Sequence, residues 1–199
     1  MCKMRILEYQ NSVQGIKRHV NIHIGEFHAS SRPTVISTLL GSCVAVCLYD
    51  PITQIGGMNH ILMPGKADMK RFDMAARYGI NAMELLINKI MNLGGNRRSL
   101  VAKIFGGAKT IALISDNMSM GRKNIEFVKN FLKTESIKII SQDISGRRSR
   151  KIWFHTDTSE VFLRRGKPTI FNEVFDLEKQ VQAKIRRNIN KSGEITFFQ

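Results

Sequence analysis

The stretch TVISTLLGSCVAVCLYDPITQIGGMNHILMPG, residues 34–65, contains the signals that decide the fold. Three of its runs are rich in β-branched and apolar residues: 34–40, 44–49 and 55–63. Glycine, serine, aspartate or proline bounds each run, and short apolar runs with such boundaries predict strands. We therefore expect three strands joined by short connections, arranged as a meander.

Outside this stretch the pattern alternates between strand and helix. Apolar residues recur at helical spacing over 73–93 and 123–133, which predicts two amphipathic helices. Further strand candidates are 20–24, 100–105, 137–140, 151–155 and 160–164. Strands, then helices, then strands favour an α+β domain with layered elements over a doubly wound parallel sheet.

The length and composition of the chain predict one folded domain with a tail at each end. A chain of 199 residues with 43% hydrophobic residues can bury a core without disulfides. We place the domain at 20–166. Residues 1–19 are polar and form an N-terminal extension, and 167–199 form a basic, partly helical C-terminal appendage.

The charge of the chain is unusual for its size. Lys and Arg number 31 against 16 Asp and Glu, which gives a formal net charge of +15 and implies an acidic partner or an anionic surface. We expect one basic surface from Arg147, Arg148, Arg150, Lys151, Arg164 and Arg165. A nucleic-acid partner would use the same charge, but no RNP, KH, zinc-finger or helix-turn-helix pattern accompanies it.

Cysteine usage and the N-terminus indicate a cytoplasmic protein. There are three cysteines, too few for a secreted disulfide framework. On one strand, Cys43 and Cys47 would have Cα atoms about 13 Å apart, too far for a disulfide. The N-terminus lacks the apolar stretch of a signal peptide, and no segment reaches the length of apolar sequence that spans a bilayer.

One pair of side chains can carry chemistry. Cys43 follows a glycine turn, and His60 lies 17 positions later in a neighbouring strand candidate, so a hairpin could bring imidazole to sulfur. Backbone amides at 41–43 could then face the oxyanion of a tetrahedral intermediate. Two alternatives stay open: Cys43 as a small buried hydrophobe, and a zinc site with Cys47, for which C-x3-C alone is a weak signal.

Several motifs, in order, resemble one family. They are residues 34–65, RYG at 77–79, AKIFGGA at 102–108, GRKNIEFV at 121–128 and QDISGRRSRKIWFHTDT at 142–158, with a weaker match at 192–198. This sequence resembles the CheD family, the chemoreceptor glutamine deamidases of bacterial chemotaxis. The resemblance covers residues 20–166.

The resemblance implies a fold and a site. The fold is a layered α/β/β sandwich with a mostly antiparallel or mixed sheet, similar to the deamidase-toxin type of cysteine hydrolase. The site is a Cys/His/Thr triad, in which the nucleophile falls on Cys43 and the base on His60. The family's threonine lies six positions before the nucleophile, where this chain has Ser37. We expect Ser37 to be the third member, with Thr38 as the alternative.

The resemblance also implies a function. It is a hydrolase that converts glutamines of methyl-accepting chemoreceptors to glutamate through a cysteine thioester, without metal or cofactor. The expected partners are the cytoplasmic helices of receptors, a CheC-like phosphatase and an anionic membrane surface near the receptor arrays, with no nucleic acid. A non-catalytic chemotaxis adaptor is the alternative, against which the intact Cys43 and His60 argue.

Overall fold

A computed structural model describes residues 17–62, 72–109 and 119–166, together with Gln180 and Ala183. The proposed appendage at 167–199 therefore lies outside the described residues except at those two positions, as does most of the proposed extension. Within the described residues, nine strands form two sheets, and two α-helices, α1 (Phe72–Asn92) and α2 (Met120–Thr134), pack beside them. None of the described helices is both long and apolar enough to cross a membrane.

The two sheets are both mixed. The four-stranded sheet has the order β1 (Arg18–Asn21), β3 (Thr34–Leu40), β8 (Arg150–His155), β9 (Val161–Arg165), and only β1 and β3 are parallel. The five-stranded sheet has the order β2 (Phe27–Ser30), β5 (Ile55–Ile61), β4 (Val44–Asp50), β6 (Val101–Gly106), β7 (Lys138–Ile144), and only β6 and β7 are parallel. The predicted α+β class is confirmed.

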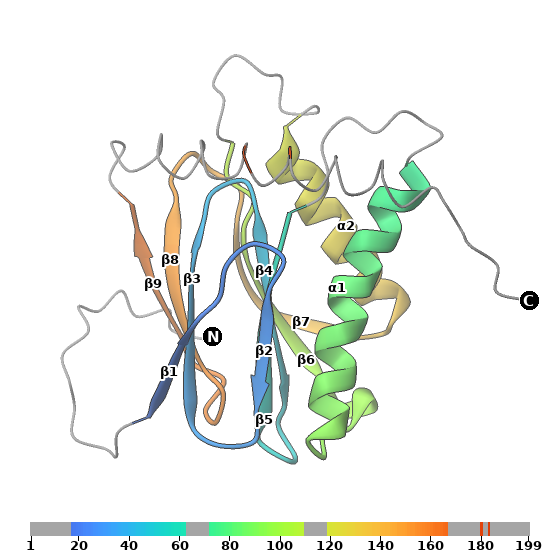
Figure 1. Cartoon of the computed structure of the whole chain (residues 1–199), viewed down its shortest axis with the longest axis vertical. Helices are drawn as coiled ribbons and strands as arrows, with labels where there is room; N and C mark the ends of the chain where they lie inside the picture. The colour runs from blue at the N-terminus through green and yellow to red at the C-terminus, as the bar shows by residue number, and fades with distance from the viewer. Residues whose placement is uncertain (1–16, 63–71, 110–118, 167–179, 181–182, 184–199) are drawn as a thin grey trace, which may run out of the picture.

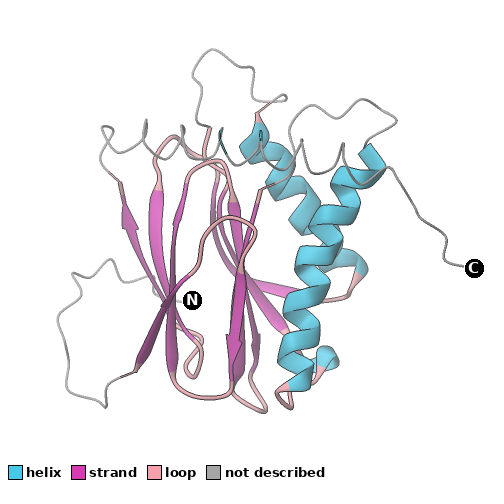
Figure 2. Cartoon of the chain, viewed as in Figure 1, coloured by secondary structure: helices cyan, strands magenta, loops and turns pink. Residues whose placement is uncertain are grey.

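The elements stack in three layers, as Figures 1 and 2 show, with the five-stranded sheet between the helices and the four-stranded sheet. One hydrophobic core fills the space between the two sheets, and a second lies between the five-stranded sheet and the helices. Strand β4 contributes to both cores. Cys43, Ala45 and Cys47 face the other sheet, while the intervening valines face the helices, which explains the continuous apolar run in its sequence.

The predicted meander is only partly correct. Strands β4 and β5 do form an antiparallel hairpin, but β3 belongs to the other sheet, where it pairs with β1 and β8. Residues 41–43 therefore carry the chain from one sheet to the other instead of making a hairpin turn. Strand β2 was not predicted from sequence, because its four residues, FHAS, have no clear apolar alternation.

Most other elements lie where the sequence places them. The helices expected at 73–93 and 123–133 correspond to α1 and α2, and strands cover 101–106, 138–144, 150–155 and 161–165. A short 3-10 helix, η2 (Arg97–Ser99), leads from α1 toward β6. The first strand begins at Arg18, two residues before the domain start expected from sequence.

Arg150 is not part of a basic surface, contrary to the sequence-based expectation. It is only 1% exposed, and its Nε donates to Oδ1 of Asp143 at 2.6 Å. Arg165 donates to the other carboxylate oxygen of Asp143 at 2.7 Å, and Arg150 also donates to the Ser145 carbonyl. Because Asp143 lies on β7 and both arginines lie on the other sheet, this buried ion cluster joins the two sheets.

Replacing Arg150 by methionine should lower the free energy of unfolding by about 3 to 5 kcal/mol, because it leaves a buried carboxylate without its main partner. Urea unfolding followed by circular dichroism measures this loss. Arg148→Met is the matched control: Arg148 lies two residues earlier, on the turn before β8, and is exposed, so its replacement should change stability by less than about 0.5 kcal/mol. Equal losses in the two variants would contradict the structural role of Arg150.

Candidate active site

The β4–β5 hairpin brings Cys43 and His60 to the same face of the five-stranded sheet. Ala45 of β4 is the register partner of His60. Cys43 directly precedes β4 and packs, like Ala45, in the core between the sheets. A residue two positions from the direct partner lies diagonally across the ladder, with a Cα separation of about 7–8 Å that a long or aromatic side chain can span. The fold-back expected from sequence is therefore present.

A hydroxyl from the opposite sheet holds the imidazole of His60. Oγ1 of Thr38, on β3, lies 2.8 Å from Nδ1 of His60. Both residues are buried. We expected Ser37 to make this contact, but its hydroxyl donates to Oδ1 of Asn21 at 3.1 Å instead.

The alternation of side chains along β3 explains this difference. The strand pairs with β8 from Val35 to Leu40 in a regular register, so no bulge rotates its side chains. Successive residues of a regular strand point to opposite faces. Thr38 shares its face with Ile36 and Leu40, which pack between the sheets, and Ser37 faces the other way. The contact expected of Ser37 is thus made by the alternative, Thr38.

The hydrogen bonds of Thr38 determine which nitrogen of His60 carries the proton. Thr38 Oγ1 lies 2.8 Å from the carbonyl oxygen of Ile22, which can only accept, so Thr38 donates its single hydroxyl proton there. Oγ1 must then accept from His60, so Nδ1 carries the imidazole proton. Nε2 is left with a lone pair, which makes it the basic nitrogen.

The environment of His60 keeps its ring neutral. Burial lowers the pKa of His60 to about 3, with a smaller contribution from His23. Nε2 is buried and has no hydrogen-bond partner in the described part of the chain. A buried polar atom without a partner costs about 1–3 kcal/mol, so such an atom calls for a functional explanation. A neutral base with an open nitrogen can accept a proton from a nearby thiol.

Backbone hydrogen bonds hold the residues around Cys43 in place. The carbonyl oxygens of Gly41 and Cys43 accept from the amides of Ala108 at 2.8 Å and Gly107 at 2.6 Å. The Ser42 carbonyl accepts from Nδ2 of Asn124, on α2, at 2.7 Å. All three carbonyls of the crossing at 41–43 are therefore tied to the end of β6 or to α2.

Glycine at position 106 permits this close approach. A Cβ at Gly106 would lie 2.2 Å from the carbonyl oxygen of Cys43, and the residue has a φ of +107°. Both the space and the backbone conformation therefore exclude other residues. This gives the GGA motif at 106–108 a specific role in supporting the Cys43 loop.

Cys47 lies in the same core as Cys43, and its burial makes it an unreactive thiol. Neither forms a disulfide within the described residues, as the sequence predicts. Burial raises the pKa of the Cys47 thiol, and Lys103 offsets this only in part, so Cys47 stays protonated. Among the described residues, no group of three or more His, Cys, Asp or Glu side chains is placed to hold a metal ion.

Asn124 is a site residue that the sequence analysis did not single out. It is fully buried on α2, on the same face as the apolar Ile125 and Val128. A polar residue within the apolar stripe of an amphipathic helix was the available signal, since a buried amide needs hydrogen-bond partners. Its partner, the Ser42 carbonyl, explains why the stripe is interrupted there.

A thiol, a neutral imidazole with one open nitrogen, and a hydroxyl that fixes the other nitrogen define a candidate thiol-dependent hydrolase. Residues 62–165 match the family described as "CheD chemotactic sensory transduction". A protein of Shewanella oneidensis named "Probable chemoreceptor glutamine deamidase CheD 1" is 39% identical over 90% of this chain and 87% of its own length. The chain belongs to the CheD family.

Other relatives agree with this assignment. "Probable chemoreceptor glutamine deamidase CheD 2" of Chromobacterium violaceum is 41% identical over 81% of this chain and 83% of its own. "Probable chemoreceptor glutamine deamidase CheD" of Stenotrophomonas maltophilia is 45% identical over 77% of this chain and 76% of its own. A crystal structure of Bacillus licheniformis hypothetical protein YfiH covers 55% of this chain and 36% of its own, with 22% identity and a TM-score of 0.31. That likeness is too low to compare the folds.

The geometry predicts that His60 stays neutral, with its proton on Nδ1, between about pH 5 and pH 8, because its pKa lies near 3. Long-range proton–nitrogen NMR spectra of the histidine rings, recorded across this range, distinguish the tautomers and report titration. The same protein unfolded in urea supplies the reference. A midpoint near the ordinary value of about 6.5, or a proton on Nε2, would contradict the site as described.

Proposed function

We propose that this protein deamidates glutamine side chains of chemoreceptors, with Cys43 as nucleophile, His60 as general base and Thr38 as the residue that orients His60. The observation that carries the proposal is the buried, unpartnered Nε2 of His60, on a ring whose Nδ1 is held by Thr38. The names of the curated relatives, chemoreceptor glutamine deamidases, supply the substrate. We also propose that the fold is similar to that of cysteine hydrolases of the deamidase-toxin type.

The first half of the reaction forms a thioester. The Cys43 thiol transfers its proton to Nε2 of His60 as its sulfur attacks the carboxamide carbon of a substrate glutamine. The resulting tetrahedral intermediate has a negative charge on oxygen. It collapses with cleavage of the carbon–nitrogen bond, and His60 returns the proton to the nitrogen, which leaves as ammonia. The glutamine side chain is then bound to Cys43 as a γ-glutamyl thioester.

The second half releases glutamate. A water molecule gives a proton to Nε2 of His60 and attacks the thioester carbon, and the carbon–sulfur bond breaks. The sulfur takes the proton back from His60, so that the thiol and the neutral imidazole are restored. The receptor has then exchanged a neutral side chain for a carboxylate. Neither half needs a metal ion or an organic cofactor. The same chemistry could hydrolyse a methyl ester.

The crossing at 41–43 is suited to stabilise the oxyanion. In a trans peptide the N–H points opposite to the C=O. Since the carbonyls of Gly41 and Ser42 face β6 and α2, the amides of Ser42 and Cys43 are directed away from those elements. Amides fixed in this way serve as oxyanion donors without reorganisation, and one such donor is worth about 3 to 4 kcal/mol of transition-state stabilisation.

The partners and the location are also proposals. A receptor substrate places the protein in the cytoplasm beside receptor arrays, where a CheC-like phosphatase and the anionic inner leaflet are accessible. Of the basic residues expected at the surface, Arg150 is buried in its ion pair, whereas Arg147, Arg148 and Arg164 are exposed and retain the means to attract an anionic surface. A non-catalytic adaptor would not require the open Nε2 of His60.

Cys43→Ala should abolish deamidation, because no other group at the site can attack the carboxamide. Intact-mass analysis of receptor fragments after incubation measures the reaction, since each deamidation adds about 1 Da. Cys47→Ala is the matched control, because it removes a buried thiol from the same strand face without touching the nucleophile, and it should retain activity. Appreciable turnover by Cys43→Ala would contradict the mechanism.

Thr38→Val should lower kcat at least about tenfold, because valine has the shape of threonine but cannot accept a hydrogen bond from Nδ1 of His60. The imidazole would then lose its fixed orientation and tautomer. Ser37→Ala removes a hydroxyl one residue away, on the opposite face of β3, and should have a much smaller effect. The same mass assay compares the two. A larger loss in Ser37→Ala would reject Thr38 as the orienting residue.

A further inference from the structure

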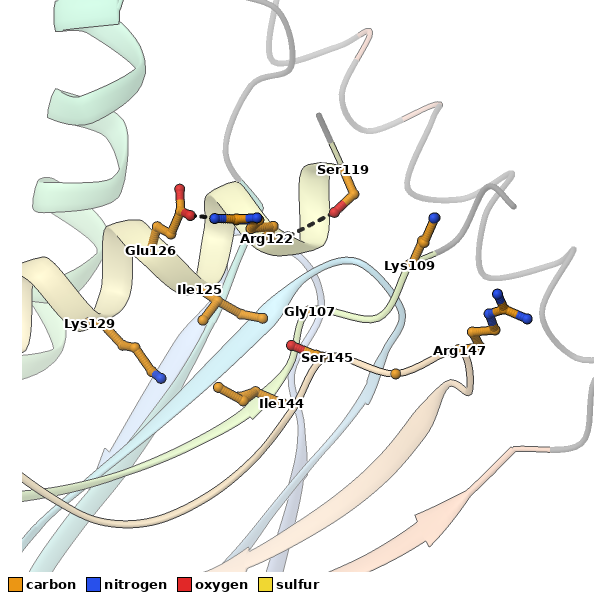
Figure 3. Close-up of a pocket in the computed structure, with 11 residues that line it drawn as sticks. Gly107, Lys109, Ser119, Arg122, Ile125, Glu126, Lys129, Ile144, Ser145 and Arg147 are labelled. Atoms are coloured by element: carbon orange, nitrogen blue, oxygen red, sulfur yellow. Dashed lines mark hydrogen bonds and ion pairs between the residues drawn. The ribbon is translucent and has the colours of Figure 1, made fainter. Parts of the chain in front are cut away.

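A basic pocket lies beside the loop that carries Cys43. Its volume is about 570 Å³, and three segments form its walls: the end of β6, the first turns of α2 and the turn between β7 and β8. Figure 3 shows side chains of α2 facing the turn that carries Arg147, with Lys109 beside that turn. Ile125 and Ile144 add apolar surface to the lining. The mechanism proposed above uses none of the charged groups in this pocket.

The pocket shares its walls with the support of the nucleophile. Gly107 lines the pocket and donates its amide to the Cys43 carbonyl at 2.6 Å. Helix α2 supplies both pocket residues and Asn124, which holds the Ser42 carbonyl. The amide of Lys109 donates to the Gly146 carbonyl at 2.8 Å, which links two of the walls. A group bound in the pocket therefore lies close to the crossing at 41–43.

The charge of the lining is mostly positive. Its charged side chains are Lys109, Arg122, Lys129, Arg147 and Glu126. The single carboxylate, Glu126, is already paired with Arg122 at 2.7 Å. No carboxylate of the described residues forms an ion pair with Lys129 or Arg147. A hollow with this balance of charge, at the positive end of a 15-residue helix, favours an anionic group.

We infer that this pocket binds an acidic side chain of the substrate protein, near the glutamine that is deamidated. This inference rests on the proposed function and extends it to the choice of glutamine. A single carboxamide offers few atoms for binding, so a protein substrate needs further contacts close to the reacting group. A carboxylate in the pocket would supply one through charge-assisted hydrogen bonds.

On a substrate with several glutamines, deamidation of one would change how the enzyme binds the next. Each deamidation creates a new carboxylate, and on a helix side chains one or two turns apart, about 5 to 11 Å, lie on the same face. A glutamate produced at one position can therefore occupy the pocket while a neighbouring glutamine reacts. Deamidation of the first glutamine should then accelerate deamidation of the next.

A peptide series tests the pocket. Helical peptides with one target glutamine carry a single glutamate at different positions within about two turns of it, and the parent peptide has alanine at those positions. For the full-length enzyme, kcat/KM at the best glutamate position should exceed that of the parent about tenfold. In the double variant Lys129→Gln/Arg147→Gln this ratio should fall to near one.

A matched control removes the same charge elsewhere. Arg98→Gln/Lys138→Gln also loses two positive charges, at exposed positions outside the pocket lining, and should keep the ratio of the unaltered enzyme. Equal kcat/KM for all peptides, or the same fall in both double variants, would overturn the inference and leave the deamidase function intact. No deamidation of any peptide or receptor fragment would instead overturn the proposed function, and the inference with it.

Discussion

The site depends on one constraint: within residues 41–43, the chain must pass from the four-stranded to the five-stranded sheet. Thr38 lies on β3 just before this crossing, and His60 lies near the end of β5, the second strand of the hairpin that follows it. The crossing therefore carries the chain from the strand of Thr38 to the sheet that holds His60, and Cys43 lies where β4 begins. Close packing of the two sheets then produces the contact of 2.8 Å between Thr38 and His60.

The remaining elements fix this crossing in space. Three carbonyls, at 41, 42 and 43, are held by the end of β6 and by Asn124 of α2, so the loop has little freedom to rotate. Arg150 joins β7 to the four-stranded sheet through its ion pair with Asp143. The amide of Ser145, on the turn between β7 and β8, donates to the Gly106 carbonyl at 2.9 Å. The buried ion cluster and the active-site loop are thus connected through one set of backbone contacts.

Sequence predicts the elements better than their arrangement. Local patterns are enough to place β3, β4 and both helices, and the hairpin expected from spacing brings Cys43 and His60 to the same face of one sheet. The choice between Ser37 and Thr38 could not be made in this way, because both faces of β3 carry two aliphatic residues and at least one hydroxyl. Similarly, nothing local distinguishes the buried Arg150 from its exposed neighbours, since its burial depends on Asp143 seven residues earlier.

The central claim is that Cys43 attacks the glutamine covalently, and trapping the intermediate tests it most directly. Hydroxylamine, added during turnover, competes with water for a thioester and converts the target glutamine to a stable hydroxamate. The account predicts this hydroxamate on receptor fragments incubated with the unaltered protein, and none with Cys43→Ala. Formation of glutamate without hydroxamate at any hydroxylamine concentration would show direct attack by water and contradict the account.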